Sequence, residues 1–292
     1  MFQGTFTAVV TPFRNGAIDF GALEKLIDAQ IAAGITGIVA VGTTGESPTL
    51  THDEKHEVIE RTIKFAKGRC QVIAGAGTNA TRDSIEAAKF AQKAGADGAL
   101  LVAPYYNKPS QEGLFRHFKA IAEATKLPVM LYNIPGRCGV DILADTVVRL
   151  ADSCRNIVSI KEASGSVDRV AELRRRLPKK FTILSGDDGL TLPFMSVGAC
   201  GVVSVASNLF PDELCALVRA CESGDFKSAE NLHRKMGPLF KDLFIEPNPV
   251  PAKTALAWRG AMSSEVRLPL CEMTEPNQAR LRKTLEEFER AK

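Results

Sequence analysis

The chain has 292 residues, 45% of them hydrophobic, and a formal net charge of +3. Two domains would fit this length at about 150 residues each, but α/β barrels of roughly 200–250 residues often form one domain. Lys and Arg are scattered without a basic block. This pattern argues against nucleic acid or an anionic membrane as the main partner, although a small anionic substrate needs only one or two local cations.

The first residues lack a charged segment followed by an apolar stretch, which predicts no signal peptide. No apolar run reaches the roughly 18 residues that a membrane span needs. The seven cysteines include no C-x-x-C pair, and their odd number favours reduced thiols over a disulfide framework. These patterns predict a soluble cytoplasmic protein of enzyme size.

Eight short apolar runs rich in Val, Ile and Leu recur along the chain. They cover residues 7–10, 37–41, 71–74, 99–103, 129–132, 157–160, 182–184 and 201–205. These runs lack polar alternation, as expected of parallel strands buried on both faces. Amphipathic stretches of helical period lie between them. The alternation predicts an α/β fold, a (β/α)8 TIM barrel.

A doubly wound open sheet is the rival architecture, but it would usually need fewer strands. Its phosphate-binding fingerprint is also missing, because Gly75 and Gly77 are not followed by the third glycine. Beyond residue 223 the pattern becomes helical, with expected helices at 226–244, 252–258 and 276–292. We therefore expect a barrel domain at residues 1–223 and a C-terminal helical extension at 224–292.

Lys161 directly follows the apolar run 157–160, whereas nearly all other lysines lie in polar contexts. In a TIM barrel, catalytic side chains lie at the carboxyl ends of the strands. An ammonium group drawn into a barrel mouth loses solvation, so its pKa falls, and the neutral amine can attack a carbonyl to form an iminium. The alternative is a lysine that only marks the strand exit and reaches solvent.

All three tyrosines of the chain, Tyr105, Tyr106 and Tyr132, fall at predicted strand ends. Phenols beside a lysine and the hydroxyls of Thr43 and Thr44 would form a proton relay suited to Schiff-base formation. The alternative for Tyr105 is simple packing over the barrel.

Arg137 follows the same strand as Tyr132 and could grip a carboxylate in bidentate fashion. Gly186, after the seventh strand, permits close approach of the backbone to a ligand. A metal site is not expected, because His52 and His56 are one turn apart without the Glu that follows the first His in metalloproteases.

Six segments together resemble the dihydrodipicolinate synthase family over essentially the whole chain. They are residues 42–47 (GTTGES), 104–107 (PYYN), 132–137 (YNIPGR), 160–163 (IKEA), 184–188 (LSGDD) and 246–249 (EPNP). Each is weak alone, but their order and spacing are specific.

The resemblance implies condensation of pyruvate with L-aspartate-4-semialdehyde to 4-hydroxy-tetrahydrodipicolinate, on the route to diaminopimelate and lysine, without a cofactor. Lys161 matches the Schiff-base lysine, and Tyr132 matches the proton-relaying tyrosine, with Thr44 and Tyr106 completing the relay. In the family, the tyrosine matched by Tyr106 reaches into the neighbouring subunit. A homotetramer built from two tight dimers is therefore implied.

The resemblance also assigns the substrate contacts. Arg137 matches the arginine that holds the semialdehyde carboxylate, Thr43 and Thr44 match the binders of the pyruvate carboxylate, and Gly186 and Val203 line the same pocket. N-acetylneuraminate lyase and keto-deoxy-sugar-acid aldolases share the lysine and tyrosine, but they usually lack the arginine. An inactive barrel that senses keto acids is a further alternative, which predicts loss of the lysine or the tyrosine.

Feedback inhibition by lysine depends on an effector site in sensitive members of the family. Four residues match positions of that site: Ser47, His52, Asn79 and Tyr105. Lys55 stands where sensitive bacterial enzymes often have histidine, and Asp83 where they have glutamate. Since Lys55 would place a cation near a cationic effector, we expect weak or absent inhibition.

Overall fold

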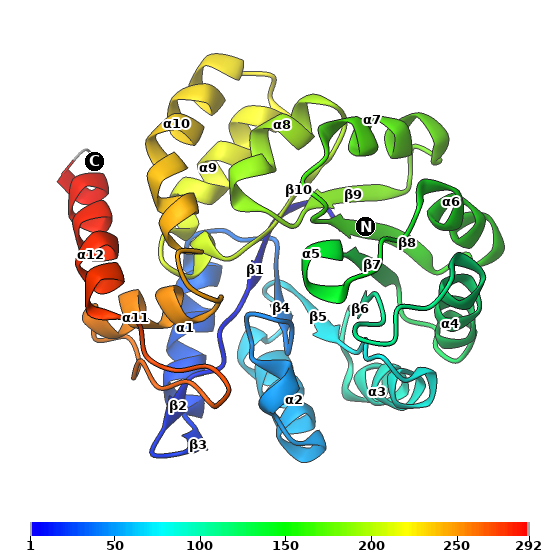
Figure 1. Cartoon of the computed structure of the whole chain (residues 1–292), viewed down its shortest axis with the longest axis horizontal. Helices are drawn as coiled ribbons and strands as arrows, with labels where there is room; N and C mark the ends of the chain where they lie inside the picture. Colours follow the sequence, from blue (N-terminus) through cyan, green and yellow to red (C-terminus); the bar gives the residue numbers. More distant parts are fainter. Residues whose placement is uncertain (1, 291–292) are drawn as a thin grey trace.

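A computed structural model describes residues 2–290 of the chain. Eight parallel strands close into a barrel in the order β1-β10-β9-β8-β7-β6-β5-β4, and helices surround them (Figure 1). The strands are β1 (Gly4–Ala8), β4 (Gly37–Ala40), β5 (Gln71–Gly75), β6 (Gly98–Val102), β7 (Val129–Asn133), β8 (Ile157–Glu162), β9 (Thr182–Ser185) and β10 (Gly201–Ser204). The predicted (β/α)8 barrel is confirmed.

Helices alternate with the strands. They are α1 (Phe20–Ala32), α2 (His52–Ala66), α3 (Thr81–Ala94), α4 (Gln111–Glu123), α6 (Ala144–Ser153), α7 (Val167–Arg176), α8 (Thr191–Ser196) and α9 (Pro211–Glu222). A small hairpin, β2 (Phe13–Arg14) and β3 (Ala17–Ile18), precedes α1. Short helices that the sequence patterns did not predict occupy the loops: η1 (Ser47–Thr49), α5 (Pro135–Cys138), η2 (Asp188–Leu190) and η3 (Ala206–Asn208).

Local sequence signals explain how the helix next to the candidate site begins. Thr51 and Glu54 form a capping box at the start of α2, with the Thr51 hydroxyl accepting from Glu54 N and the Glu54 carboxylate accepting from Thr51 N. This arrangement satisfies backbone donors that the first helical turn leaves free. It fixes the start of α2 a few residues beyond the loop at 42–47.

The register between β7 and β8 positions the centre of the barrel. Val129 pairs with Ile157, but Met130 pairs with Ser159, so Val158 is an extra residue in β8. A bulge of this kind shifts the in–out alternation of the residues that follow. As a result, Tyr132 pairs directly with Lys161. The preceding residue, Ile160, packs in the apolar cluster between the strands and the surrounding helices.

β1 and β8 differ from the expected bounds by two or more residues, and the other strands differ by one residue at one or both ends. β1 covers Gly4–Ala8, whereas residues 7–10 were expected: the strand already begins at Gly4, and the apolar residues after Ala8 belong to the following loop. β8 continues through Lys161 to Glu162, so Lys161 belongs to the strand and does not follow it. A lysine and a glutamate ended the apolar run in the sequence, although the backbone ladder continues beyond it.

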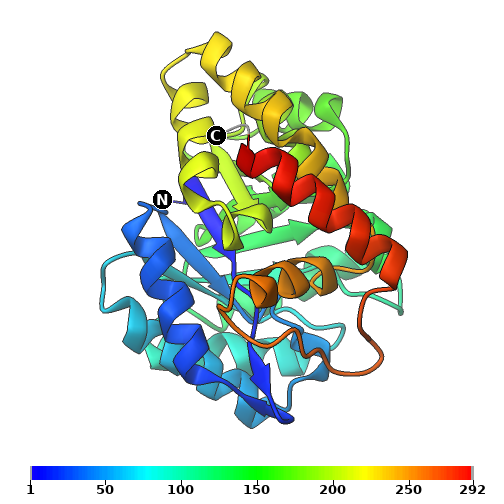
Figure 2. The ribbon, with the colours of Figure 1, turned by 90° about the vertical axis from the view of Figure 1, so that its left-hand side faces the viewer.

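The chain after α9 forms α10 (Phe226–Asp242), α11 (Val250–Trp258) and α12 (Glu275–Arg290). Figure 2 shows α10, α11 and α12 gathered on one side of the barrel. The predicted helices lie here, but α10 ends two residues early, α11 begins two residues early and α12 begins one residue early. Positions 291–292 fall outside the described residues. One apolar cluster joins Leu26 of α1 and Val202 of β10 to Met236 and Leu285 of the extension.

Candidate active site

Lys161 lies in the interior of the barrel, where its side chain is 6% exposed. Its Nζ is 4.2 Å from the centroid of the Tyr132 ring, which is itself 4% exposed. Gly186 leaves room for the lysine, because a Cβ atom at this position would lie 3.1 Å from Lys161 Cε. The structure therefore brings together three of the predicted site residues.

The pKa of Lys161 is lowered from 10.5 to about 7. Burial is the main cause, since the ammonium form loses its hydration. Asp188 opposes this shift and Arg137 adds to it through their charges. Within residues 2–290, no carboxylate forms an ion pair with Lys161 to hold its proton. Much of Lys161 is therefore the neutral amine near pH 7.

The phenol of Tyr132 is hydrogen-bonded to the side chain of Thr43. Burial raises the pKa of Tyr132 to about 12, while the charge of Arg137 and a hydrogen bond with the Thr43 side chain lower it. The phenol therefore keeps its proton at neutral pH and can deliver it to a neighbouring group. Thr44, which the family resemblance places in the relay, has a different neighbour, since its Oγ1 accepts from Asn248 Nδ2 at 2.9 Å.

A small cavity of about 30 Å³ opens beside these side chains. Thr43, Ser47 and Tyr132 contribute its polar lining, and Gly42 and Gly77 leave backbone exposed to it. Val203 is buried in the apolar cluster that fills the barrel interior and that also contains Tyr132. Tyr132 thus lies between Lys161, whose Nζ faces its ring, and this cavity, which Thr43 and Ser47 line with hydroxyl groups.

Two predicted site residues are not buried with Lys161 in this chain. Tyr106 is 90% exposed and has a positive φ of 73°, a backbone conformation that non-glycine residues adopt rarely. Arg137 is also exposed, on the short helix α5 that follows β7. Both positions are available to a ligand or to another subunit.

The four candidate effector residues divide into two pairs. Ser47 and His52 line a second small cavity of about 30 Å³, together with Lys55 and Asp83. Burial lowers the pKa of Lys55, and the negative charge of Asp83 opposes this shift. A lysine side chain therefore already occupies the wall of this cavity.

The other two candidate effector residues lie on neighbouring loops, Asn79 after β5 and Tyr105 after β6. Tyr105 is 37% exposed, and burial of its remaining surface raises the pKa of its phenol, while a backbone hydrogen bond at Asn79 lowers it. Asn107 Nδ2 donates to the Asn79 carbonyl at 2.9 Å. The loop after β6 is thus tied to the loop after β5.

Glu162 is a buried residue that the sequence analysis did not single out. Its carboxylate accepts from Asn133 Nδ2 at 3.1 Å, from Ser164 N at 2.8 Å and from Arg169 Nε at 2.7 Å. These bonds join β7, β8 and α7 directly behind Tyr132 and Lys161. The sequence shows a glutamate next to the lysine, but it does not show that this glutamate is buried or that Asn133, 29 positions away, bonds to it.

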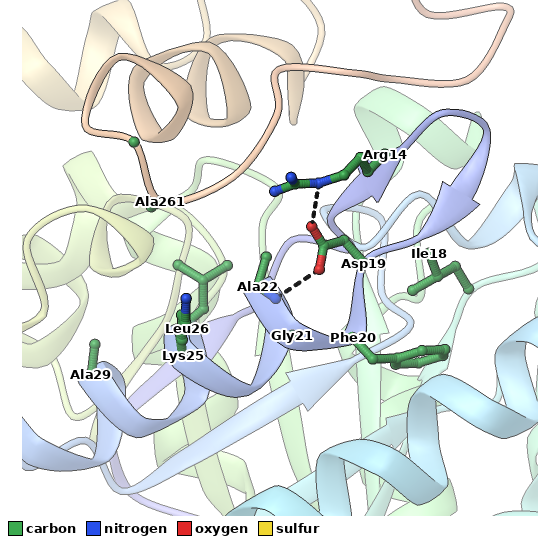
Figure 3. Close-up of a pocket in the computed structure, with 11 residues that line it drawn as sticks. Arg14, Ile18, Asp19, Phe20, Gly21, Ala22, Lys25, Leu26, Ala29 and Ala261 are labelled. Atoms are coloured by element: carbon green, nitrogen blue, oxygen red, sulfur yellow. Dashed lines mark hydrogen bonds and ion pairs between the residues drawn. The ribbon is translucent and has the colours of Figure 1, made fainter.

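A larger cavity lies elsewhere, between α1, the β2–β3 hairpin and Ala261 (Figure 3). It measures about 670 Å³ and contains an ion pair of 2.8 Å between Arg14 and Asp19. None of the predicted site residues lines it. Among residues 2–290, no group of three or more His, Cys, Asp or Glu side chains could hold a metal ion.

None of the helices within residues 2–290 combines the length and the apolar character needed to cross a membrane.

The model of the dihydrodipicolinate synthetase family matches residues 1–288. The chain belongs to this family. It is 48% identical over 288 residues to the 4-hydroxy-tetrahydrodipicolinate synthase of Endomicrobium trichonymphae, which covers 99% of both chains.

Solved structures of family members have the same fold. That of the 4-hydroxy-tetrahydrodipicolinate synthase from Methylacidiphilum fumariolicum is 56% identical, with a TM-score of 0.98 over 99% of this chain and 97% of the other. The dihydrodipicolinate synthase of Acinetobacter baumannii, solved in complex with pyruvate, is 45% identical, with a TM-score of 0.96 over 99% of both chains. The resemblance inferred from the six segments is confirmed.

Proposed function

We propose that this chain is a lyase that condenses pyruvate with L-aspartate-4-semialdehyde through a Schiff base on Lys161, in diaminopimelate and lysine biosynthesis. The observation that carries the proposal is a buried lysine with a pKa of about 7 beside the Tyr132 ring. A neutral amine in an apolar pocket is the form that attacks a keto acid. Relatives that carry the synthase name cover the whole chain, which supports the choice of substrates.

The geometry supports a role for each residue in the first half of the reaction. Lys161 Nζ attacks the carbonyl carbon of pyruvate and forms a carbinolamine. The phenol of Tyr132, hydrogen-bonded to Thr43, gives a proton to the leaving hydroxyl, so that water departs and the iminium forms. Thr43 and Thr44 bind the pyruvate carboxylate, and Gly186 and Val203 form the wall next to the lysine.

The second half joins the two substrates. Loss of a methyl proton converts the iminium to an enamine, whose carbon attacks the aldehyde of the semialdehyde. The amino group of the semialdehyde then attacks the iminium, which closes the ring and releases Lys161 as the free amine. Arg137, exposed at the barrel mouth, holds the semialdehyde carboxylate.

Tyr106 enters this proposal through a second subunit. Its 90% exposure and its strained backbone fit a side chain that is held for a partner's active site. We infer that the enzyme is a homotetramer of two tight dimers, working in the cytoplasm, and that Tyr106 completes the relay of a neighbouring subunit. Sedimentation of the purified protein and of a Tyr106→Ala variant tests the assembly and this contact.

Weak or absent inhibition by lysine follows from the cavity next to α2. Lys55 lines it beside Ser47 and His52, so a lysine effector would meet a cation there. Titrating the enzyme with lysine tests this expectation. Strong inhibition below about 1 mM would contradict it, because the cavity would then bind lysine with more than about 4 kcal/mol despite the cation in its wall.

Trapping with borohydride tests the proposed reaction. After incubation with pyruvate and reduction, peptide mass spectrometry should find the adduct on Lys161. Turnover with aspartate semialdehyde should then exceed turnover with sugar-derived aldehydes, which a sugar-acid aldolase would prefer. Arg137→Ala should lose semialdehyde turnover but still trap pyruvate. An adduct on another residue, or none, would refute the Schiff-base assignment.

A further inference from the structure

The loop of residues 42–47, which carries Thr43 and Thr44, is bonded to α11 and to the segment just before it. Asn248 Nδ2 donates to Thr44 Oγ1 at 2.9 Å. Lys253 Nζ lies 2.6 Å from Glu46 Oε1, and the two side chains are 0% exposed. Both contacts join positions more than 200 residues apart in the sequence.

The buried ion pair is embedded in further hydrogen bonds. Lys253 Nζ also donates to the Thr11 carbonyl at 2.9 Å and lies 4.2 Å from the centroid of the Phe13 ring. The second oxygen of Glu46 accepts from Arg267 N at 3.0 Å. Removing two charges from water is costly unless such partners are present. The loop is thus fixed at a site where every oxygen of Glu46 is bonded.

Glu46 has a positive φ of 54°, which is unusual for a residue with a side chain. The loop turns at this point from the threonines into η1. A residue held in this conformation needs surrounding contacts that keep it there. The bonds from Lys253 and Arg267 supply them, so the path of the loop depends on the C-terminal segment.

The bond from Asn248 also sets the direction of the Thr44 hydroxyl. Because Oγ1 accepts from the amide, its single proton is free to be donated to another group. A threonine that donates is what binding of a keto-acid carboxylate requires. The neighbouring Thr43 is hydrogen-bonded to Tyr132. One loop therefore carries both the threonine that would bind the pyruvate carboxylate and the threonine that contacts the proton relay.

We propose that Asn248 and the Glu46–Lys253 pair are positioning residues that orient Thr43 and Thr44 for pyruvate. This inference rests on the proposed function of the threonines. In this proposal the C-terminal extension contributes to the active site by contacting the loop of residues 42–47. It does not contact the substrate. If the contacts served stability alone, variants that keep the fold would also keep the affinity for pyruvate.

Asn248→Asp is the first test, because it keeps the shape of the side chain and replaces the amide donor with an acceptor. Thr44 would then donate its proton to the carboxylate and turn it away from pyruvate. We expect the KM for pyruvate to rise at least about tenfold, and Asn248→Ala to show a smaller rise of about threefold, in line with the usual worth of one hydrogen bond. Lys161 should still form the borohydride-trapped adduct at saturating pyruvate.

The double variant Glu46→Gln with Lys253→Met tests the ion pair. Replacing both charges avoids leaving one of them buried alone, so the protein should fold. We expect a thermal midpoint close to that of the wild type but a KM for pyruvate raised about tenfold. The single variant Lys253→Met should lose stability as well.

Asp242→Asn is the matched control. Asp242 is a buried carboxylate of α10 that accepts from Arg280 Nη2 at 2.6 Å and from Thr284 Oγ1 at 2.7 Å, without contact to the loop. It should lower the thermal midpoint and leave the KM for pyruvate unchanged.

Three outcomes separate the ideas. If the wild type forms no adduct with pyruvate, the proposed function fails. The positioning idea is then decided by a crystal structure of the double variant Glu46→Gln with Lys253→Met, in which the loop of residues 42–47 should move. If the wild type does form the adduct but the variants keep its KM for pyruvate, or if that loop keeps its position in the double variant, the inference is overturned.

Discussion

Two buried lysines illustrate how this barrel separates chemistry from structure. Lys161 and Lys253 are 6% and 0% exposed, and each ammonium nitrogen lies 4.2 Å from the centroid of an aromatic ring. Lys253 has a carboxylate oxygen of Glu46 at 2.6 Å, whereas no ion pair of the described chain includes Lys161. Burial lowers the pKa of both, but only at Lys253 is a bonded carboxylate opposing it.

The difference shows that burial alone does not make a lysine nucleophilic. A paired ammonium in an apolar site keeps its proton because the ion pair compensates for the lost hydration. An unpaired one gives up its proton at a pH near neutrality, and its lone pair is then free to attack a carbonyl. Lys161, the proposed nucleophile, and Lys253, the structural cation, therefore differ mainly in the presence of one glutamate.

Removing the nucleophile should have the largest effect. Lys161→Ala lacks the amine that forms the iminium, so kcat/KM should fall at least about 10³-fold and no adduct should be trapped. Steady-state assays and mass spectrometry measure both quantities. Residual synthase activity within tenfold of the wild type would place the nucleophile elsewhere.

Breaking the structural pair should reduce stability most. Lys253→Met leaves Glu46 as a buried carboxylate without its cation, which should lower the free energy of unfolding by about 3–5 kcal/mol. Denaturant titration measures the change, and the double variant with Glu46→Gln should recover most of it. An equally large loss in the double variant would mean that packing, and not charge, explains the effect.

The relay should contribute less than the nucleophile. Tyr132→Phe keeps the ring against Lys161 but removes the phenol that meets Thr43, so kcat should fall about 10²–10³-fold. Pyruvate should still form its adduct, only more slowly. Rapid-quench trapping distinguishes a slow dehydration from a lost site; a wild-type rate of trapping would exclude Tyr132 as the proton donor.

Lys161→Met should stabilise the protein, in contrast to Lys253→Met. The folded pKa of Lys161 lies near 7 and its ordinary value is 10.5, so the folded state binds fewer protons than the unfolded state between these values. The resulting penalty is absent above about pH 10.5, grows as the pH falls and is complete below about 7. At pH 7 the variant should gain about 2 kcal/mol or more in unfolding free energy, and unfolding curves at several pH values check it.

The sequence predicted most of the barrel because its strand and helix periods are local signals. It also indicated Lys161 as the candidate nucleophile, since a charged residue directly after an apolar run is visible within one segment. Lys253 is just as unusual, because its neighbours in Val250–Trp258 are nearly all apolar, but its partner Glu46 is about 200 positions away. A contact of that range leaves no trace in local periodicity.

Other parts of the site depended on detail that patterns do not carry. Adjacent threonines cannot be distinguished by spacing, and the structure places Thr43, not Thr44, against Tyr132. The bulge at Val158 turns Lys161 into the barrel, and it too has no signature in composition. Tyr106 is exposed in this chain, and the contact proposed for it with a neighbouring subunit is one that a single sequence does not describe.

The rate at which pyruvate adds to Lys161 at different pH values tests the central contrast most directly. The enzyme is exposed briefly to pyruvate between about pH 5 and 10, quenched in borohydride at one fixed pH, and the labelled peptides are quantified. We predict that labelling of Lys161 rises with a midpoint near pH 7 and that Lys253 is not labelled. A midpoint near 10, as for an exposed lysine, would contradict the assignment of Lys161 as a buried neutral nucleophile.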